Sequence, residues 1–227
     1  MRGSSRKRNR LIIMAHPDDP ELACGGSIAR WAGKDSVCNV IVSCGEKGTW
    51  DRNASPLLVA EKREQEAKKA ARCLGVKRVV FLRHPDGEVA RMKTLKLELA
   101  ALIRRFKPYT VVTHDPWSRY FHPDHRATAH AVIDGIMIAR DWHFYPFLLE
   151  IGLKPHRPGE LLLGITEQPN CVIDITRTYE KKMKAISMHK SQLGQLPLWQ
   201  KRVRQRVVNE GALAGYRFGE GFHRMRI

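Results

Sequence analysis

Short apolar segments alternate with longer amphipathic segments along most of this sequence. Apolar runs of roughly four to eight residues between turn-forming residues are typical of buried strands. We therefore predict strands at residues 11–15, 37–44, 78–82 and 109–113. Helices are predicted after each of them, at residues 21–32, 57–74, 92–106 and 122–140.

Several of these helices carry recognisable end signals. Gly75 stands just beyond the Ala-, Glu- and Lys-rich segment 57–74, where a glycine C-cap is expected. Pro123 lies in the first turn of the last helix, where proline is tolerated. Four repeats of strand and helix predict an α/β fold, with a mostly parallel sheet and helices on both faces. Ligands of such sheets bind beyond the carboxyl ends of the strands, where the strand order reverses.

The pattern weakens after Asp141. Strands are predicted at residues 161–166 and 171–175, and a helix at residues 177–189. Residues 193–227 are basic and dotted with glycine, and we interpret them as a C-terminal extension that forms a subunit contact, a lid or a disordered tail. Residues 1–10 are interpreted as a basic, disordered N-terminal tail.

Composition narrows the class of protein. The chain has 227 residues, 43% of them hydrophobic, and no apolar run of the roughly 18 to 20 residues that cross a bilayer. Its five cysteines form no CxxC pair, which favours buried thiols in a reducing cytoplasm.

The net charge of +17 is compatible with a nucleic-acid partner. Much of the excess positive charge lies at the two ends of the chain, however, and aromatic residues make up only 7% of the sequence. The charge alone does not choose among a nucleic acid, an anionic small substrate and a solvated basic surface. The candidate base and metal ligands of this sequence favour a small-molecule substrate over nucleic acid, and homo-oligomerisation stays open.

Three His-Pro-Asp tripeptides follow predicted strands, at residues 16–18, 84–86 and 122–124. One such tripeptide is a common turn signal. The first, however, continues to Asp19 and the third to His125, so two loops of one sheet carry imidazoles and carboxylates together. The tripeptide 84–86 has no second metal-binding residue beside it, and we interpret it as a turn or a substrate-facing loop.

Imidazole and carboxylate are standard zinc ligands, and a catalytic zinc keeps three protein ligands. The first loop can supply two ligands and the third loop one. Adjacent carboxylates in the first loop point in different directions, so one can bind the metal while the other acts as general base. His122 and His125 are three residues apart at a helix start and can face one site, with Asp124 holding an imidazole.

These motifs resemble the PIG-L/LmbE-like family of zinc-dependent N-deacetylases that act on amino sugars. The segment 15–19 with Gly25-Gly26 resembles its first motif, and the segments 113–116 and 122–125 resemble its second. The sequence His189-Lys190-Ser191-Gln192 resembles its C-terminal marker, so the resemblance covers residues 11–192 as one domain. It implies a Rossmann-like fold and a zinc-dependent N-acetyl hydrolase.

The resemblance also implies a role for each candidate residue. The metal ligands would be His16, Asp19 and His125, and Asp18 would be the general base. His122 would stabilise the oxyanion or protonate the leaving amine. The remaining implied residues are Asp124, which would orient His122, and Glu46, Arg63 and Asp86 near the sugar.

The sequence departs from the family pattern at one position. The family commonly has Glu directly after the paired Asp, whereas here Pro20 intervenes before Glu21, which leaves the start of the first helix uncertain.

Two rival functions also remain. The first is another metal-dependent hydrolase, such as a phosphoesterase. The second is a basic α/β binding module without catalytic activity. The sequence does not choose among acylated substrates.

Overall fold

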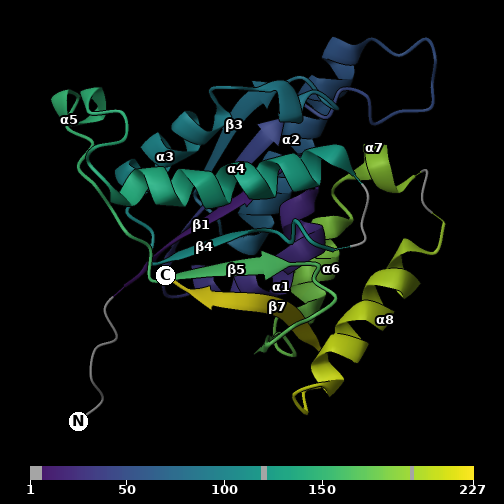
Figure 1. Ribbon diagram of the computed structural model, residues 1–227. Helices are drawn as coiled ribbons and strands as arrows, with labels where there is room; N and C mark the ends of the chain where they lie inside the picture. The colour runs from purple at the N-terminus through teal and green to yellow at the C-terminus, as the bar shows by residue number, and fades with distance from the viewer. Residues whose placement is uncertain (1–6, 119–121, 195–196) are drawn as a thin grey trace.

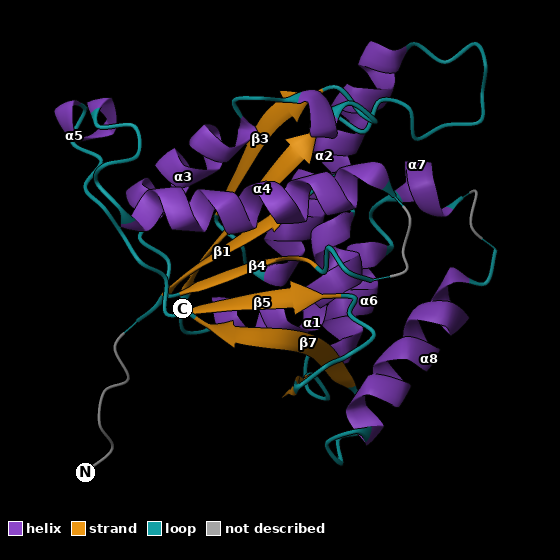
Figure 2. Cartoon of the chain, viewed as in Figure 1, coloured by secondary structure: helices purple, strands orange, loops and turns teal. Residues whose placement is uncertain are grey.

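A single seven-stranded sheet organises the computed structural model, which describes residues 7–118, 122–194 and 197–227. The strand order is β3-β2-β1-β4-β5-β7-β6, and only β7 runs antiparallel to its neighbours (Figures 1 and 2). The strands are β1 (Asn9–Met14), β2 (Ser36–Ser43), β3 (Arg78–His84), β4 (Thr110–His114), β5 (Glu160–Gly164), β6 (Cys171–Asp174) and β7 (Gly219–Arg226). The predicted fold class, an α/β fold with a Rossmann-like, mostly parallel sheet, is confirmed.

Helices cover both faces of the sheet. They are α1 (Asp19–Ala32), α2 (Pro56–Leu74), α3 (Leu95–Phe106), α4 (Pro123–Arg140), α5 (Phe147–Glu150), α6 (Tyr179–Ile186), α7 (Lys190–Leu193) and α8 (Trp199–Ala212), with a 3₁₀ turn η1 (Val89–Arg91). None of the described helices has the length and apolar character that a bilayer span requires.

Alternation along the strands creates two apolar layers. In β1, Leu11 and Ile13 face α3 and α4, whereas Ile12 and Met14 face α1, α2 and α6. All four side chains are fully buried, which explains why β1 is a continuous apolar run.

The predicted elements are present with shifted ends. Helix α1 begins at Asp19, because Pro20 occupies its first turn without breaking it. Residues 89–94 form η1 and a turn, so α3 begins at Leu95. Gly75 caps α2 with a φ of 92°, the left-handed conformation predicted for it.

The C-terminal segment is part of the sheet. Strand β7 pairs with both β5 and β6, and α8 lies near it (Figure 1). The Val203 and Val207 side chains of α8 are buried. The division of the chain at residue 192 stays a prediction, but the sequence pattern did not reveal these two elements.

Strand β7 also reaches α1. Helix α1 is kinked at Cys24, and the Glu220 carboxylate accepts the backbone amides of Gly26 and Ser27 beyond the kink, at 2.9 and 2.7 Å. The Lys182 ammonium lies 2.6 Å from the same carboxylate, and both side chains are buried. This ion pair therefore fixes the second half of α1 against β7 and α6.

Candidate metal centre

The candidate site lies beyond the carboxyl ends of β1, β3 and β4. The chain leaves β1 into α1 on one face of the sheet, whereas the segment after β4 leads into α4 on the other face. Strand order reverses at this point, where ligands of such sheets bind. The first and third His-Pro-Asp tripeptides therefore meet here, as the sequence predicted.

Three predicted ligands converge on one point. His16 Nδ1 lies 3.0 Å from His125 Nε2, and Asp19 Oδ2 lies 3.2 Å from each of these nitrogens. Ligand bonds of about 2.0–2.1 Å in a tetrahedral site place neighbouring donor atoms about 3.3 Å apart. The donor triangle therefore fits a single divalent ion.

Charge interactions favour the ligand form of the carboxylate. Burial raises the pKa of Asp19, but the adjacent imidazoles of His125 and His114 outweigh burial and hold that pKa well below its usual value. Burial lowers the pKa of His16, but hydrogen bonds to Asp124, Asp19 and Asp86 leave it well above its usual value. An ion bound here would displace that proton.

His114 packs against two of the three predicted ligands, His125 and Asp19. Its ring stacks on His125 with centroids 3.9 Å apart, and its Nε2 lies 3.4 Å from Asp19 Oδ2. That nitrogen accepts the Ala15 amide at 3.0 Å, which occupies its lone pair. Burial lowers the pKa of His114 to about 4, so the ring is neutral. The sequence motif contained His114, but no role was predicted for it.

Asp18 differs from its neighbour in exposure and partners. Its side chain is 15% exposed, and its Oδ1 accepts a hydrogen bond from Arg63 Nη2 at 2.7 Å. The two carboxylates thus point in different directions, and Asp18 stands beside the donor triangle.

Arg63 is buried and held at both ends of its guanidinium. Its Nη1 donates to the Gly45 carbonyl at 2.7 Å while Nη2 binds Asp18. Gly45 has a φ of +66°, and a Cβ atom there would lie 2.4 Å from Arg63 Nη1. Arg63 was predicted near the sugar; that role stays a prediction, and the contacts make it a support for Asp18.

His122 caps α4 and lies beside the triangle. Its Nδ1 accepts the Asp124 amide at 3.3 Å, and its ring centroid lies 4.5 Å from that of His16 and 5.0 Å from that of His125. Burial, then the charges of the other two imidazoles, lower the pKa of His122.

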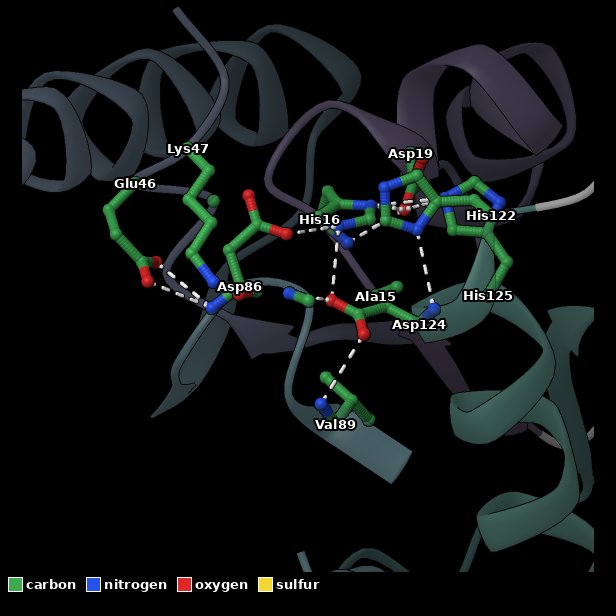
Figure 3. Close-up of polar contacts among 12 residues, drawn as sticks. Ala15, His16, Asp19, Glu46, Lys47, Asp86, Val89, His122, Asp124 and His125 are labelled. Atoms are coloured by element: carbon green, nitrogen blue, oxygen red, sulfur yellow. Dashed lines mark hydrogen bonds and ion pairs between the residues drawn. The ribbon is translucent and has the colours of Figure 1, made fainter. Parts of the chain in front are cut away.

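The Asp124 carboxylate has a different partner from the one predicted. It accepts the amides of Gly87 at 2.6 Å and Val89 at 3.3 Å, and it lies 3.6 Å from His16 Nε2 (Figure 3). Asp124 follows the first residue of α4 and faces the loop after β3, whose backbone amides draw the carboxylate. It therefore orients His16, and only its backbone amide contacts His122.

Asp86 completes the support of His16. Its Oδ1 lies 3.1 Å from His16 Nε2, and the hydrogen bond to His16 outweighs burial and lowers the pKa of Asp86 to about 2. Glu46 accepts the Asp86 amide at 2.9 and 3.1 Å through its two oxygens (Figure 3). A carboxylate behind a ligand imidazole fixes the ring and its tautomer. Glu46 and Asp86 thus border the site, and their contact with a sugar stays a prediction.

The segment 189–192 supports the site from behind. His189 Nε2 lies 3.0 Å from Glu21 Oε2, and both side chains are buried. Ser191 Oγ donates to Glu66 at 2.6 Å, and Gln192 Nε2 donates to the Gly48 carbonyl at 2.7 Å. The sequence motif was recognised, but these partners depend on the folded chain.

Comparison with known proteins gives a consistent result. Residues 11–136 match the PIG-L family, described as GlcNAc-PI de-N-acetylase. The chain is 32% identical to the diacetylchitobiose deacetylase of Thermococcus kodakarensis, over 93% of this chain and 80% of that protein. It is 28% identical to the 1D-myo-inositol 2-acetamido-2-deoxy-alpha-D-glucopyranoside deacetylase of Rhodococcus jostii, over 84% of each chain.

A solved structure agrees over nearly the whole chain. The N,N'-diacetylchitobiose deacetylase from Pyrococcus horikoshii, crystallised with its inhibitor MPG, superposes with a TM-score of 0.93 and 33% sequence identity. The match covers 97% of this chain and 85% of that one. The similarity therefore includes β7 and α8 as well as the motif-bearing half.

Proposed function

Because the chain belongs to the PIG-L family of de-N-acetylases, we propose that it hydrolyses the N-acetyl group of an amino sugar or sugar conjugate. The observation that carries this proposal is the donor triangle of His16, Asp19 and His125 beside the partly exposed carboxylate of Asp18. A hydrolase of this type needs a bound ion and a base that is not itself a ligand.

We propose zinc as the ion, since two imidazoles and one carboxylate form a common catalytic zinc set. When bound, zinc supplies a Lewis acid that polarises a carbonyl and lowers the pKa of water. His16, Asp19 and His125 would hold it, and Asp86 and Asp124 would orient the His16 ring.

The chain's own residues perform the proton transfers. Asp18 removes a proton from the attacking water as oxygen adds to the acetyl carbonyl carbon. His122 donates a hydrogen bond to the developing oxyanion, and the proton taken by Asp18 passes to the departing nitrogen. Cleavage of the C–N bond yields acetate and the free amine. Arg63 keeps the Asp18 carboxylate in place through this cycle.

The similarity to diacetylchitobiose deacetylases makes N,N'-diacetylchitobiose the first substrate to test. A GlcNAc–inositol conjugate is the second, because the relative from R. jostii is named for such a compound. Cytoplasmic location and a homo-oligomer remain proposals; the five free thiols support a reducing compartment.

The test is acetate release by the full chain, stripped of metal and then reloaded with one equivalent of zinc. We expect acetate from at least one of the two substrates, in the reloaded protein and not in the stripped one. Phosphate release from p-nitrophenyl phosphate serves as the control for a phosphoesterase. Phosphate release in place of acetate would contradict the proposal.

A further inference from the structure

A cavity lies at the amino ends of β1, β4 and β5, at the other end of the sheet from the metal centre, and it extends to Val172 and Asp174 on β6. Its volume is about 580 Å³, within the range of about 300–1,000 Å³ that is usual for small-molecule sites. Arg8 precedes β1, Tyr109 precedes β4 and Gly159 precedes β5, so the cavity opens where these strands begin. In Figure 1 this is the end at which the chain terminus marked C lies.

The cavity wall is strongly cationic. Two carboxylates, Glu160 and Asp174, line it. The cationic side chains in the wall outnumber them and are Arg8, Arg10, Arg30, Lys34, Arg224 and Arg226. They come from the start of β1, the end of α1 and the end of β7, and so surround the cavity from three sides.

Part of this charge forms no salt bridge among the described residues. Arg10 pairs with Asp35 at 2.7 Å, and Arg224 lies 3.4 Å from Glu160. In the part of the chain that the structure describes, no salt bridge forms to the other four cations, although Arg30 donates to the Asp174 carbonyl at 2.6 Å and Lys34 lies within the electrostatic reach of Asp35. The charges of Arg8 and Arg226 are therefore available to an external anion.

Aromatic rings hold two of the guanidinium groups in place. Arg8 lies over the Tyr109 ring, 3.9 Å from its centroid, and Arg10 lies over Trp31 at 4.6 Å. Such stacking restricts a guanidinium that would otherwise be mobile. Arg10 is further fixed by Thr110 Oγ1, 2.8 Å from its Nη1. The wall is therefore ordered before any ligand binds.

We propose that this cavity binds a small polyanion containing a chain of two or more phosphate groups. Guanidinium forks match phosphate oxygens in pairs, and charges from three sides exceed what one phosphate can use. The ring faces of Tyr109 and Trp31 are occupied by arginines, so recognition rests on the phosphates and not on stacking of a base.

The test uses inorganic tripolyphosphate with the full chain at low ionic strength, measured by isothermal titration calorimetry. We expect saturable binding of one tripolyphosphate per chain, weakened by added salt. ATP, as a second probe, distinguishes the sources: equal affinity assigns the site to the phosphate chain alone, and tighter ATP binding assigns it to a nucleotide. Absence of saturable binding with both probes would overturn the proposal.

A matched pair of double variants locates the site. Arg8→Gln/Arg226→Gln removes two unpaired cavity charges, and we expect tripolyphosphate affinity to fall by about tenfold or more. Lys69→Gln/Arg72→Gln removes the same charge from the exposed side of α2 and should change affinity by less than about twofold. Equal losses in both variants would show attraction to the overall charge and overturn the proposal. Circular dichroism confirms that each variant is folded.

Discussion

The two ends of the sheet differ in how their charged side chains are balanced. At the carboxyl end, acids and imidazoles are buried together, and each carboxylate of the metal centre has an imidazole, a guanidinium or a backbone amide beside it. At the amino end, arginines border an open cavity, and among the described residues Arg8 and Arg226 form no salt bridge. The first arrangement fits a cation and the second fits an anion.

A single substitution should matter more at the carboxyl end of the sheet than at the amino end. A buried charge that loses its partner keeps its full desolvation cost, so the carboxyl end should respond sharply to one change. Exposed charges are solvated and screened, so the amino end should respond gradually as charges are removed.

Removal of a ligand should abolish the metal centre. His125→Ala opens the donor triangle, and we expect it to lose bound zinc and lower acetate release to the background rate. His130→Ala is the matched control, because His130 is exposed on the same helix. Mass-spectrometric metal analysis measures the zinc content. Stoichiometric zinc in His125→Ala would remove this residue from the ligand set.

Removal of the base should separate chemistry from metal binding. Asp18→Asn keeps the shape of the side chain and the donor triangle but cannot accept a proton. We expect kcat to fall by about 10²- to 10⁴-fold while zinc remains bound. Turnover equal to that of the parent protein, with the same zinc content, would show that another group acts as the base.

Loss of the support behind the base should have a smaller effect. Arg63→Gln removes the guanidinium that binds Asp18 and the Gly45 carbonyl, and we expect kcat to fall by about 10- to 100-fold with zinc retained. Measuring kcat and KM separately distinguishes support from sugar binding. A rise in KM with unchanged kcat would favour the original prediction that Arg63 contacts the substrate.

Local sequence patterns predicted the first half of the fold well. Strand β1 and helix α2 follow from an apolar run and from helix-forming residues that end at Gly75. The turns that carry Asp19 and His125 are also local, because proline and the helix start define them. The convergence of the two loops then follows from the parallel order of β1 and β4.

Long-range partners could not be predicted in the same way. Strand β7 carries charged residues such as Arg224 and Arg226, and only its pairing with β5 and β6 makes it a strand. Asp124 was expected beside His122, but the amides of the β3 loop direct its carboxylate to His16. Arg63 looks like an exposed helix residue in the sequence, and its burial depends on the loop at Gly45.

Helix α1 joins the two ends of the sheet, since Asp19 begins it at the metal centre and Trp31 lies near its end beside the cavity. Glu220 binds it midway, so Glu220→Gln tests whether both ends rest on one cooperative core. The change leaves the buried Lys182 ammonium without a counter-charge, and we expect the free energy of unfolding to fall by about 3–5 kcal/mol. Because no group of the metal centre is altered, kcat at 25 °C should change by less than about twofold while the variant stays folded.

Urea denaturation measures the stability of the Glu220→Gln variant, with the exposed Glu180→Gln on α6 as control. A single transition at lower urea supports one core, whereas two separate transitions would show that the ends unfold independently.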